Sequence, residues 1–256
     1  MPPFFDAAPP VSRTVRPKPG LRRAPAAPSD ALRAKALEVH RRLGEEFGLP
    51  IPYFHSLDPL SELVSSLLSH RTRNAESGRA FKALRERFPD WADVIDADPA
   101  EVEALIRGVT WPEAKGPRIQ QVLGDVRDRH GALTLDFLAD MEPEAARAWL
   151  AAIPGVGPKT SAAVLSFSTL RMPALPVDSH HHRVAQRLEL IGPKVDVGPA
   201  HDALRALLPA DYSAQDLYDD HEILMLHGQK TCHHRAPACG RCRLIDLCPA
   251  GRARGA

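Results

Sequence analysis

The four cysteines of this 256-residue chain stand in one short tract, and this grouping constrains the fold more than any other feature. They are spaced C-x6-C-x2-C-x5-C, at positions Cys232, Cys239, Cys242 and Cys248. Structural disulfides usually join distant parts of a chain, so thiols this close together indicate a metal or cluster site. Four thiolates can hold a tetrahedral zinc ion or a [4Fe–4S] cluster. Only Cys239 and Cys242 have the short spacing of a zinc knuckle.

From Ser29 onward the sequence predicts helices. Apolar residues recur at helical spacing after the Asp58-Pro59 pair, and Asp98-Pro99 is a second helix start, predicted to run to Leu105. Asp30 is expected to cap the first helix. Further helices are expected over residues 31–47, 74–89, 113–130, 143–152, 179–189, 199–207 and 213–227, with another starting at Pro158. Since no segment alternates as a half-buried strand does, the predicted fold class is all-α.

Composition narrows the class of protein. With 44% hydrophobic and 25% charged residues the chain is globular, and its net charge of +1 excludes a strongly basic protein that wraps nucleic acid. Neither an apolar run of ~18 residues nor a signal peptide is evident, which predicts an intracellular protein that does not contact membranes. Residues 1–28 are rich in proline and basic, so we expect a disordered basic tail that either attracts nucleic acid weakly or has no function.

The segment 150–160 reads LAAIPGVGPKT and predicts a tight hairpin between two helices. Uncovered backbone amides at Gly155 and Gly157, next to the start of a helix, form a positive concavity suited to a phosphate oxygen. Val156 is expected at the tip, where it would approach a sugar or a groove. The alternative is a plain helix–helix connection without a ligand.

Lys159 follows this turn, close to a helix N-terminus, where positive surroundings and desolvation lower the pKa of an amine and make it nucleophilic. Asp178 precedes a predicted helix and is either its N-cap alone or also a functional carboxylate. His180 opens a run of three histidines that diverge by ~100° per residue, so they cannot chelate one ion together. We expect only His180 to approach DNA or the site, and the other two to be solvated.

Taken together, the hairpin with Lys159, the segment around Asp178 and the cysteine tract resemble the helix-hairpin-helix DNA glycosylase superfamily. The cysteine spacing is similar to that of its endonuclease III branch, and the resemblance runs from about Leu60 to Pro249. It implies a bilobal fold: a six-helix barrel lobe over residues 57–170, and an iron–sulfur cluster lobe over residues 29–56 plus 171–250. It also implies that Lys159 and Asp178 are the catalytic pair, and that the tract binds a [4Fe–4S] cluster.

The resemblance implies base excision repair by a bifunctional DNA glycosylase with abasic-site lyase activity. Such an enzyme acts on oxidised pyrimidines in duplex DNA, as a monomer in the cytoplasm or, in a bacterium, with the nucleoid. One alternative is a monofunctional mismatch glycosylase, although the adenine-removing relatives lack a lysine at the position of Lys159. The other is a non-catalytic or weakly active DNA-binding homologue.

Two loops depart from the family pattern, and one surface is basic. Arg71 stands where the family commonly has a glutamine that fills the gap left by a flipped base, and Trp111 stands where it often has a leucine. Trp111 could stack on an orphaned base or be an ordinary buried aromatic. Arg235 and Arg241 lie in the cysteine tract and are expected to contact phosphates, unless they are only a solvated charge run.

Overall fold

The computed structural model describes residues 27–254, and its regular elements within that range are all helices. The all-α prediction is therefore confirmed for this part of the chain, whereas the predicted tail over residues 1–28 lies almost wholly outside it. Among the described helices, none combines the length and the apolar character needed to cross a membrane.

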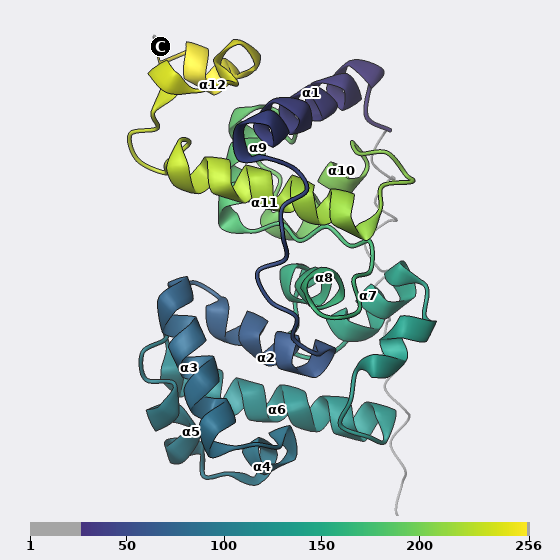
Figure 1. Cartoon of the computed structure of the whole chain (residues 1–256), viewed down its shortest axis with the longest axis vertical. Helices are drawn as coiled ribbons and strands as arrows, with labels where there is room; N and C mark the ends of the chain where they lie inside the picture. The colour runs from purple at the N-terminus through teal and green to yellow at the C-terminus, as the bar shows by residue number, and fades with distance from the viewer. Residues whose placement is uncertain (1–26, 255–256) are drawn as a thin grey trace, which may run out of the picture.

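The helices form two bodies, one above the other in Figure 1. The lower body contains α2 (Pro59–Ser69), α3 (Asn74–Arg87), α4 (Trp91–Asp96), α5 (Pro99–Leu105), α6 (Pro112–His130), the 3-10 turn η1 (Asp136–Asp140), α7 (Pro143–Ala151) and α8 (Pro158–Phe167). The upper body contains α1 (Asp30–Phe47), α9 (Ser179–Arg187), α10 (Val197–Arg205), α11 (Ala214–Lys230), the turns η2 (Cys239–Arg241) and η3 (Ile245–Leu247), and α12 (Pro249–Arg252). The N-terminal helix thus packs beside the C-terminal segments.

Helix starts follow local capping chemistry. The predicted helices are confirmed to within three residues, and the side chain of Asp58 accepts a hydrogen bond from the Ser61 amide at 2.9 Å. Asp30 was the wrong cap for α1: Ser29 has the extended backbone of an N-cap and accepts from the Leu32 amide, which leaves Asp30 inside the first turn. The sequence analysis missed α4, because six residues are too few to show a helical period.

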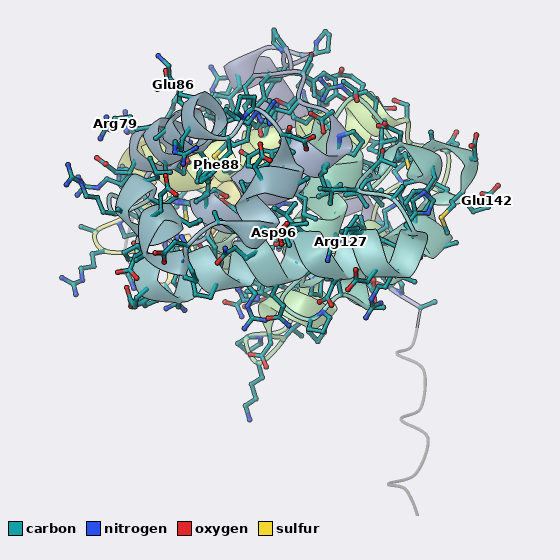
Figure 2. All side chains as sticks on the ribbon, turned by 90° about the horizontal axis from the view of Figure 1, so that it is seen from below. Arg79, Glu86, Phe88, Asp96, Arg127 and Glu142 are labelled. Atoms are coloured by element: carbon teal, nitrogen blue, oxygen red, sulfur yellow. The ribbon has the colours of Figure 1, made fainter. Side chains whose placement is uncertain are left out.

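Buried apolar residues gather in two main clusters. The larger one joins the helices of the lower body, where α6 crosses the underside and carries Arg127 on the face seen in Figure 2. The second cluster joins α1, α9, α10 and α11. A small third cluster links the two bodies, with Phe167 of α8 lying 5.7 Å from Tyr218 of α11 between ring centroids. The lobe boundaries expected from the sequence stay a prediction.

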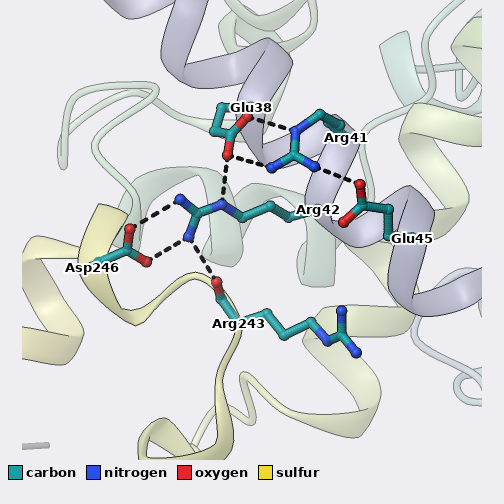
Figure 3. A network of polar contacts seen from close by, with 6 residues as sticks. All are labelled: Glu38, Arg41, Arg42, Glu45, Arg243 and Asp246. Carbon is teal, nitrogen blue, oxygen red and sulfur yellow. Dashed lines mark hydrogen bonds and ion pairs between the residues drawn. The ribbon is translucent and has the colours of Figure 1, made fainter.

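Helix α1 also holds the C-terminal tract by polar contacts, drawn in Figure 3. The Arg42 guanidinium donates to both carboxylate oxygens of Asp246, at 2.6 and 3.0 Å, and to the main-chain carbonyl of Arg243. Glu38 steadies the same guanidinium at 2.7 Å. Arg243 joins this network through its carbonyl, while its own guanidinium makes none of the contacts drawn.

Candidate active site

Lys159 lies in the first turn of α8, directly after the hairpin, and its side chain is partly buried. Its Nζ atom is 6.0 Å from the centre of the Phe167 ring. Burial lowers the pKa of Lys159, and the negative charges of Glu62, Asp178 and Glu222 oppose that shift. The amine is therefore easier to deprotonate than an exposed lysine, as a nucleophile requires.

Asp178 fills one of the two roles that the sequence left open, that of the N-cap of α9. Its Oδ1 atom accepts the His181 amide at 2.7 Å and so caps α9, and its charge reaches Lys159. Burial acts to raise the pKa of Asp178, but the His221 imidazole and the His181 N–H group outweigh it, and the pKa lies below its usual range. Asp178 is therefore a carboxylate at neutral pH.

The histidine run is placed differently from the expectation. His180 is half-buried, with Nδ1 3.1 Å from Arg183 Nη2. His181 is fully buried and lies 5.8 Å from His221 between ring centroids, while His182 contacts the Val195 carbonyl at 2.8 Å. The expectation that His181 is solvated was wrong, because α9 packs one of its faces directly against α11, whereas His182 is half-buried.

Two buried glutamates near Lys159 were missed by the sequence analysis. Glu62 on α2 is 2% exposed, and its Oε1 atom accepts a hydrogen bond from Ser66 Oγ at 2.9 Å. Burial and the charges of Asp178 and Asp219 raise the pKa of Glu222, on α11, to about 7. In the sequence, each of these two glutamates stands among the apolar residues of a predicted helix, and this was the signal that could have revealed them.

The structure confirms the tight turn predicted for the hairpin, but it places Val156 in the core and not at the tip. Gly155 has φ of 98°, a conformation that favours glycine, and Gly157 is exposed with open space where a side chain would project. Val156 is only 4% exposed and belongs to the lower core, and its amide donates to the Ile153 carbonyl. It is not a tip residue, because the turn directs its side chain inward.

Arg118 on α6 adds a positive charge to this turn. A Cβ atom at Gly155 would lie 2.5 Å from Cδ of Arg118, so the arginine packs directly on the glycine. The Arg118 guanidinium is exposed beside this turn, and the sequence analysis did not single it out.

Arg71 and Trp111 come together on the surface. The Arg71 guanidinium carbon is 5.7 Å from the Trp111 ring centre, and Trp111 is 48% exposed, so it is not an ordinary buried aromatic. Both residues have positive φ, of 53° and 57°. Thr110 Oγ1 donates to the Arg71 carbonyl at 2.9 Å, and Lys115 Nζ donates to Thr72 Oγ1 at 2.8 Å. These bonds fasten the two loops to each other, and their contact with DNA stays a prediction.

All four cysteines line one pocket between α9, α11 and the C-terminal turns, and none of them forms a disulfide. Arg187 Nη1 lies 3.1 Å from Cys232 Sγ, and the Gly251 amide donates to Cys248 Sγ at 3.3 Å. Within residues 27–254, no three Cys, His, Asp or Glu side chains converge as ligands of a single metal ion. Arg235 and Arg241 are exposed beside this pocket.

Comparison with known proteins agrees with this geometry. The sequence pattern of the HhH-GPD superfamily of base excision DNA repair proteins matches residues 64–209. Endonuclease III of Escherichia coli K12 is 29% identical over 216 residues, which cover 84% of this chain and 95% of that protein. Endonuclease III of Thermotoga maritima is 30% identical over 199 residues, 77% of this chain and 86% of the relative.

Other relatives extend the comparison. A putative DNA glycosylase of Arabidopsis thaliana is 31% identical over 170 residues, which cover 66% of this chain but only 56% of the plant protein. Among solved structures, a trapped endonuclease III–DNA covalent intermediate has a TM-score of 0.74 at 24% identity, covering 88% of this chain and 99% of that one. A thermostable thymine-DNA glycosylase has a TM-score of 0.71 at 19% identity, covering 88% and 100%. These two structures share the fold.

The hairpin, the partly buried lysine and the helical architecture, together with these comparisons, therefore define a helix-hairpin-helix DNA repair protein. Since the family pattern covers more than half of the chain, the chain belongs to the HhH-GPD superfamily of base excision DNA repair proteins.

We predict that Gly157→Val weakens binding to lesion-containing and undamaged duplexes alike, by about tenfold. The added side chain projects into open space, so it blocks the approach of a phosphate without disturbing the fold. Fluorescence anisotropy with both duplexes measures the effect, and Gly124→Val on α6, also in open space, is the control. A loss confined to lesion discrimination would show that the hairpin reads the base.

We predict that Glu222→Gln becomes progressively more stable than the wild type between pH 5 and pH 8. The folded chain binds this proton more tightly than the unfolded chain, so raising the pH from 4.5 towards 7 costs the wild type stability. At ~1.4 kcal/mol per pKa unit, the difference reaches at most about 3 kcal/mol. Urea unfolding at both pH values measures it, with exposed Glu86→Gln as the control. An equal change in both variants would contradict the assignment.

Proposed function

We propose that this protein is a bifunctional DNA glycosylase and abasic-site lyase that removes oxidised pyrimidines from duplex DNA. The observation that carries the proposal is the Lys159 amine, which has a pKa lowered by burial and lies beside the carboxylate of Asp178. Relatives at about 30% identity are named endonuclease III, and one similar structure is an endonuclease III trapped covalently on DNA. A DNA-bound relative supports duplex DNA as the partner.

In the proposed reaction, a base turned out of the duplex exposes C1′ of its sugar to Lys159. The neutral amine attacks C1′, the base leaves with the bonding electron pair, and opening of the sugar gives a Schiff base. β-Elimination then breaks the strand on the 3′ side. The ionised carboxylate of Asp178 stabilises positive charge on the sugar as the base departs. The amides of Gly155 and Gly157 and the guanidinium of Arg118 hold the backbone phosphates.

We further propose that Cys232, Cys239, Cys242 and Cys248 hold a [4Fe–4S] cluster. The four thiols share one pocket and form no disulfide, which suits the four cysteine ligands of one cluster. N–H donors from Arg187 and Gly251 point at two of the sulfurs and stabilise their negative charge. The cluster would keep the loop with Arg235 and Arg241 rigid for docking on DNA.

Lys159→Gln is expected to lower base release and strand cleavage at least about 10³-fold, because one nucleophile starts both steps. DNA affinity should fall by no more than ~1 kcal/mol, since only one cation is lost. Separate assays of base release, strand cleavage and borohydride trapping measure this, with exposed Lys194→Gln as the control. Base release that persists without cleavage would indicate a monofunctional enzyme. A wild type without either activity would indicate a DNA-binding homologue.

Purified protein is expected to be brown and to contain about four iron and four sulfide per chain. Cys242→Ser should lose the iron and unfold the upper body at lower temperature, because ligation contributes to folding free energy. Iron, sulfide and zinc analysis with circular dichroism measures both effects. Stoichiometric zinc without iron, in protein prepared anaerobically, would contradict the cluster.

A further inference from the structure

Two stretches of chain connect the lower and the upper body (Figure 1). The first crossing segment, residues 48–58, runs from α1 to α2, and the second crossing segment, residues 168–178, runs from α8 to α9. The second segment separates the two groups of the proposed reaction centre, because Lys159 lies on α8 and Asp178 is the last residue of the segment. Its conformation therefore helps to determine where the carboxylate stands relative to the amine.

Arg171, within the second crossing segment, has a strained backbone. Its φ of 47° lies in the left-handed region, which favours glycine. A residue with a full side chain stays in this conformation only where surrounding contacts hold it, and such strain is concentrated at functional places in a structure. The half-buried side chain of Arg171 makes contacts of this kind.

The Arg171 guanidinium fastens the first crossing segment to the end of α8. Its Nη2 atom donates to the His55 carbonyl at 2.9 Å, and its Nη1 atom donates to the Phe167 carbonyl at 2.7 Å. The guanidinium carbon also lies 3.3 Å from the centre of the Tyr53 ring. One side chain thus joins both stretches of chain that connect the two bodies.

The partners of Arg171 lead to the upper body and to the reacting amine. The Tyr53 ring lies against Tyr218 of α11, with ring centroids 4.0 Å apart. Phe167 meets Tyr218 edge-on at 5.7 Å, and its ring centre is 6.0 Å from Lys159 Nζ. The guanidinium therefore holds two of the aromatic residues that fill the boundary between the bodies.

We propose that Arg171 is a positioning residue that fixes the upper body relative to α8 and so keeps Asp178 aligned with the Lys159 amine. This role rests on the proposed function and names a residue on which that function depends. A guanidinium suits the role because its planar fork donates to two carbonyls in fixed directions while its face lies on an aromatic ring. Arg171 acts through the two bodies and not by touching DNA.

The alignment can be measured on the amine itself. The titratable groups whose charges interact with Lys159 come from both bodies: Glu62 and His70 from the lower body, and Asp178, His221 and Glu222 from the upper body. The carboxylates of Asp178 and Glu222 act to raise the pKa of Lys159. Displacing the upper body weakens both effects, so the pKa of Lys159 falls further. Loss of a nearby positive charge alone would raise it, so the direction separates positioning from a direct effect of charge.

The test uses Arg171→Gly, because glycine accepts a φ of 47° and only the side chain is lost. Competitive acetylation of the DNA-free protein over a range of pH, analysed by mass spectrometry, gives the pKa of Lys159. We expect Arg171→Gly to lower it by at least about half a pH unit. Single-turnover base release should slow at least about tenfold, while DNA affinity changes less than about twofold.

Arg205→Ala is the matched control. The Arg205 guanidinium also donates to main-chain carbonyls, those of Pro209 and Ala210 at 2.9 and 3.0 Å, but both lie in the upper body. This variant should leave the pKa of Lys159 and the rate of base release unchanged. A fall in that pKa of the same size as in Arg171→Gly would show a general loss of stability and overturn the positioning role.

Two further outcomes decide the proposal. An unchanged or raised pKa of Lys159 in Arg171→Gly, folded by circular dichroism, overturns the positioning role. If Arg171→Gly does not fold, Arg171→Lys decides in the same way, because it keeps the charge and loses the fork. Wild-type protein that releases no base overturns the proposed function instead, and the acetylation result, which needs no DNA, still decides whether Arg171 aligns the two groups.

Discussion

The arrangement of the molecule depends on α9, a nine-residue helix held at both ends. At its start Asp178 accepts the His181 amide and directs its charge towards Lys159. One turn further on, Arg183 donates to the Cys232 carbonyl at 3.0 Å, and at the end of the helix Arg187 lies 3.1 Å from Cys232 Sγ. The same short helix therefore positions both Asp178 and the cysteine tract, so under the proposed function it would link the cluster to the reaction centre.

The second constraint is electrostatic. Burial disfavours the ammonium form of Lys159, whereas three carboxylates from α2, from the cap of α9 and from α11 favour it. Burial has the larger effect, so the pKa of Lys159 is lowered and the amine is easier to deprotonate than that of an exposed lysine. Glu222, with its pKa raised to about 7, changes charge near neutral pH and thereby alters this balance. The site combines elements of both bodies, and neither body alone contains it.

Much of the fold was accessible from the sequence because local chemistry determines helix starts. Asp58-Pro59, Asp98-Pro99 and the hairpin glycines act within one turn of the chain. Lys159 and Asp178 were singled out as a pair by the resemblance to the helix-hairpin-helix glycosylases. The burial of individual side chains could not be predicted from the sequence, because it depends on how the helices pack against one another. Val156 and His181 turn inward only because of the helices that face them, and Glu62 becomes a site residue only when α2 packs against α8.

The central claim is that the amine of Lys159 bonds to the sugar, and peptide mapping of a trapped complex tests it most directly. Wild-type protein is incubated with an abasic duplex, reduced with borohydride, digested and analysed by tandem mass spectrometry. The account predicts that the deoxyribose adduct is found on the peptide that contains Lys159 and on Lys159 itself. An adduct on Lys115 or on the N-terminal amine, with Lys159 unmodified, would contradict it.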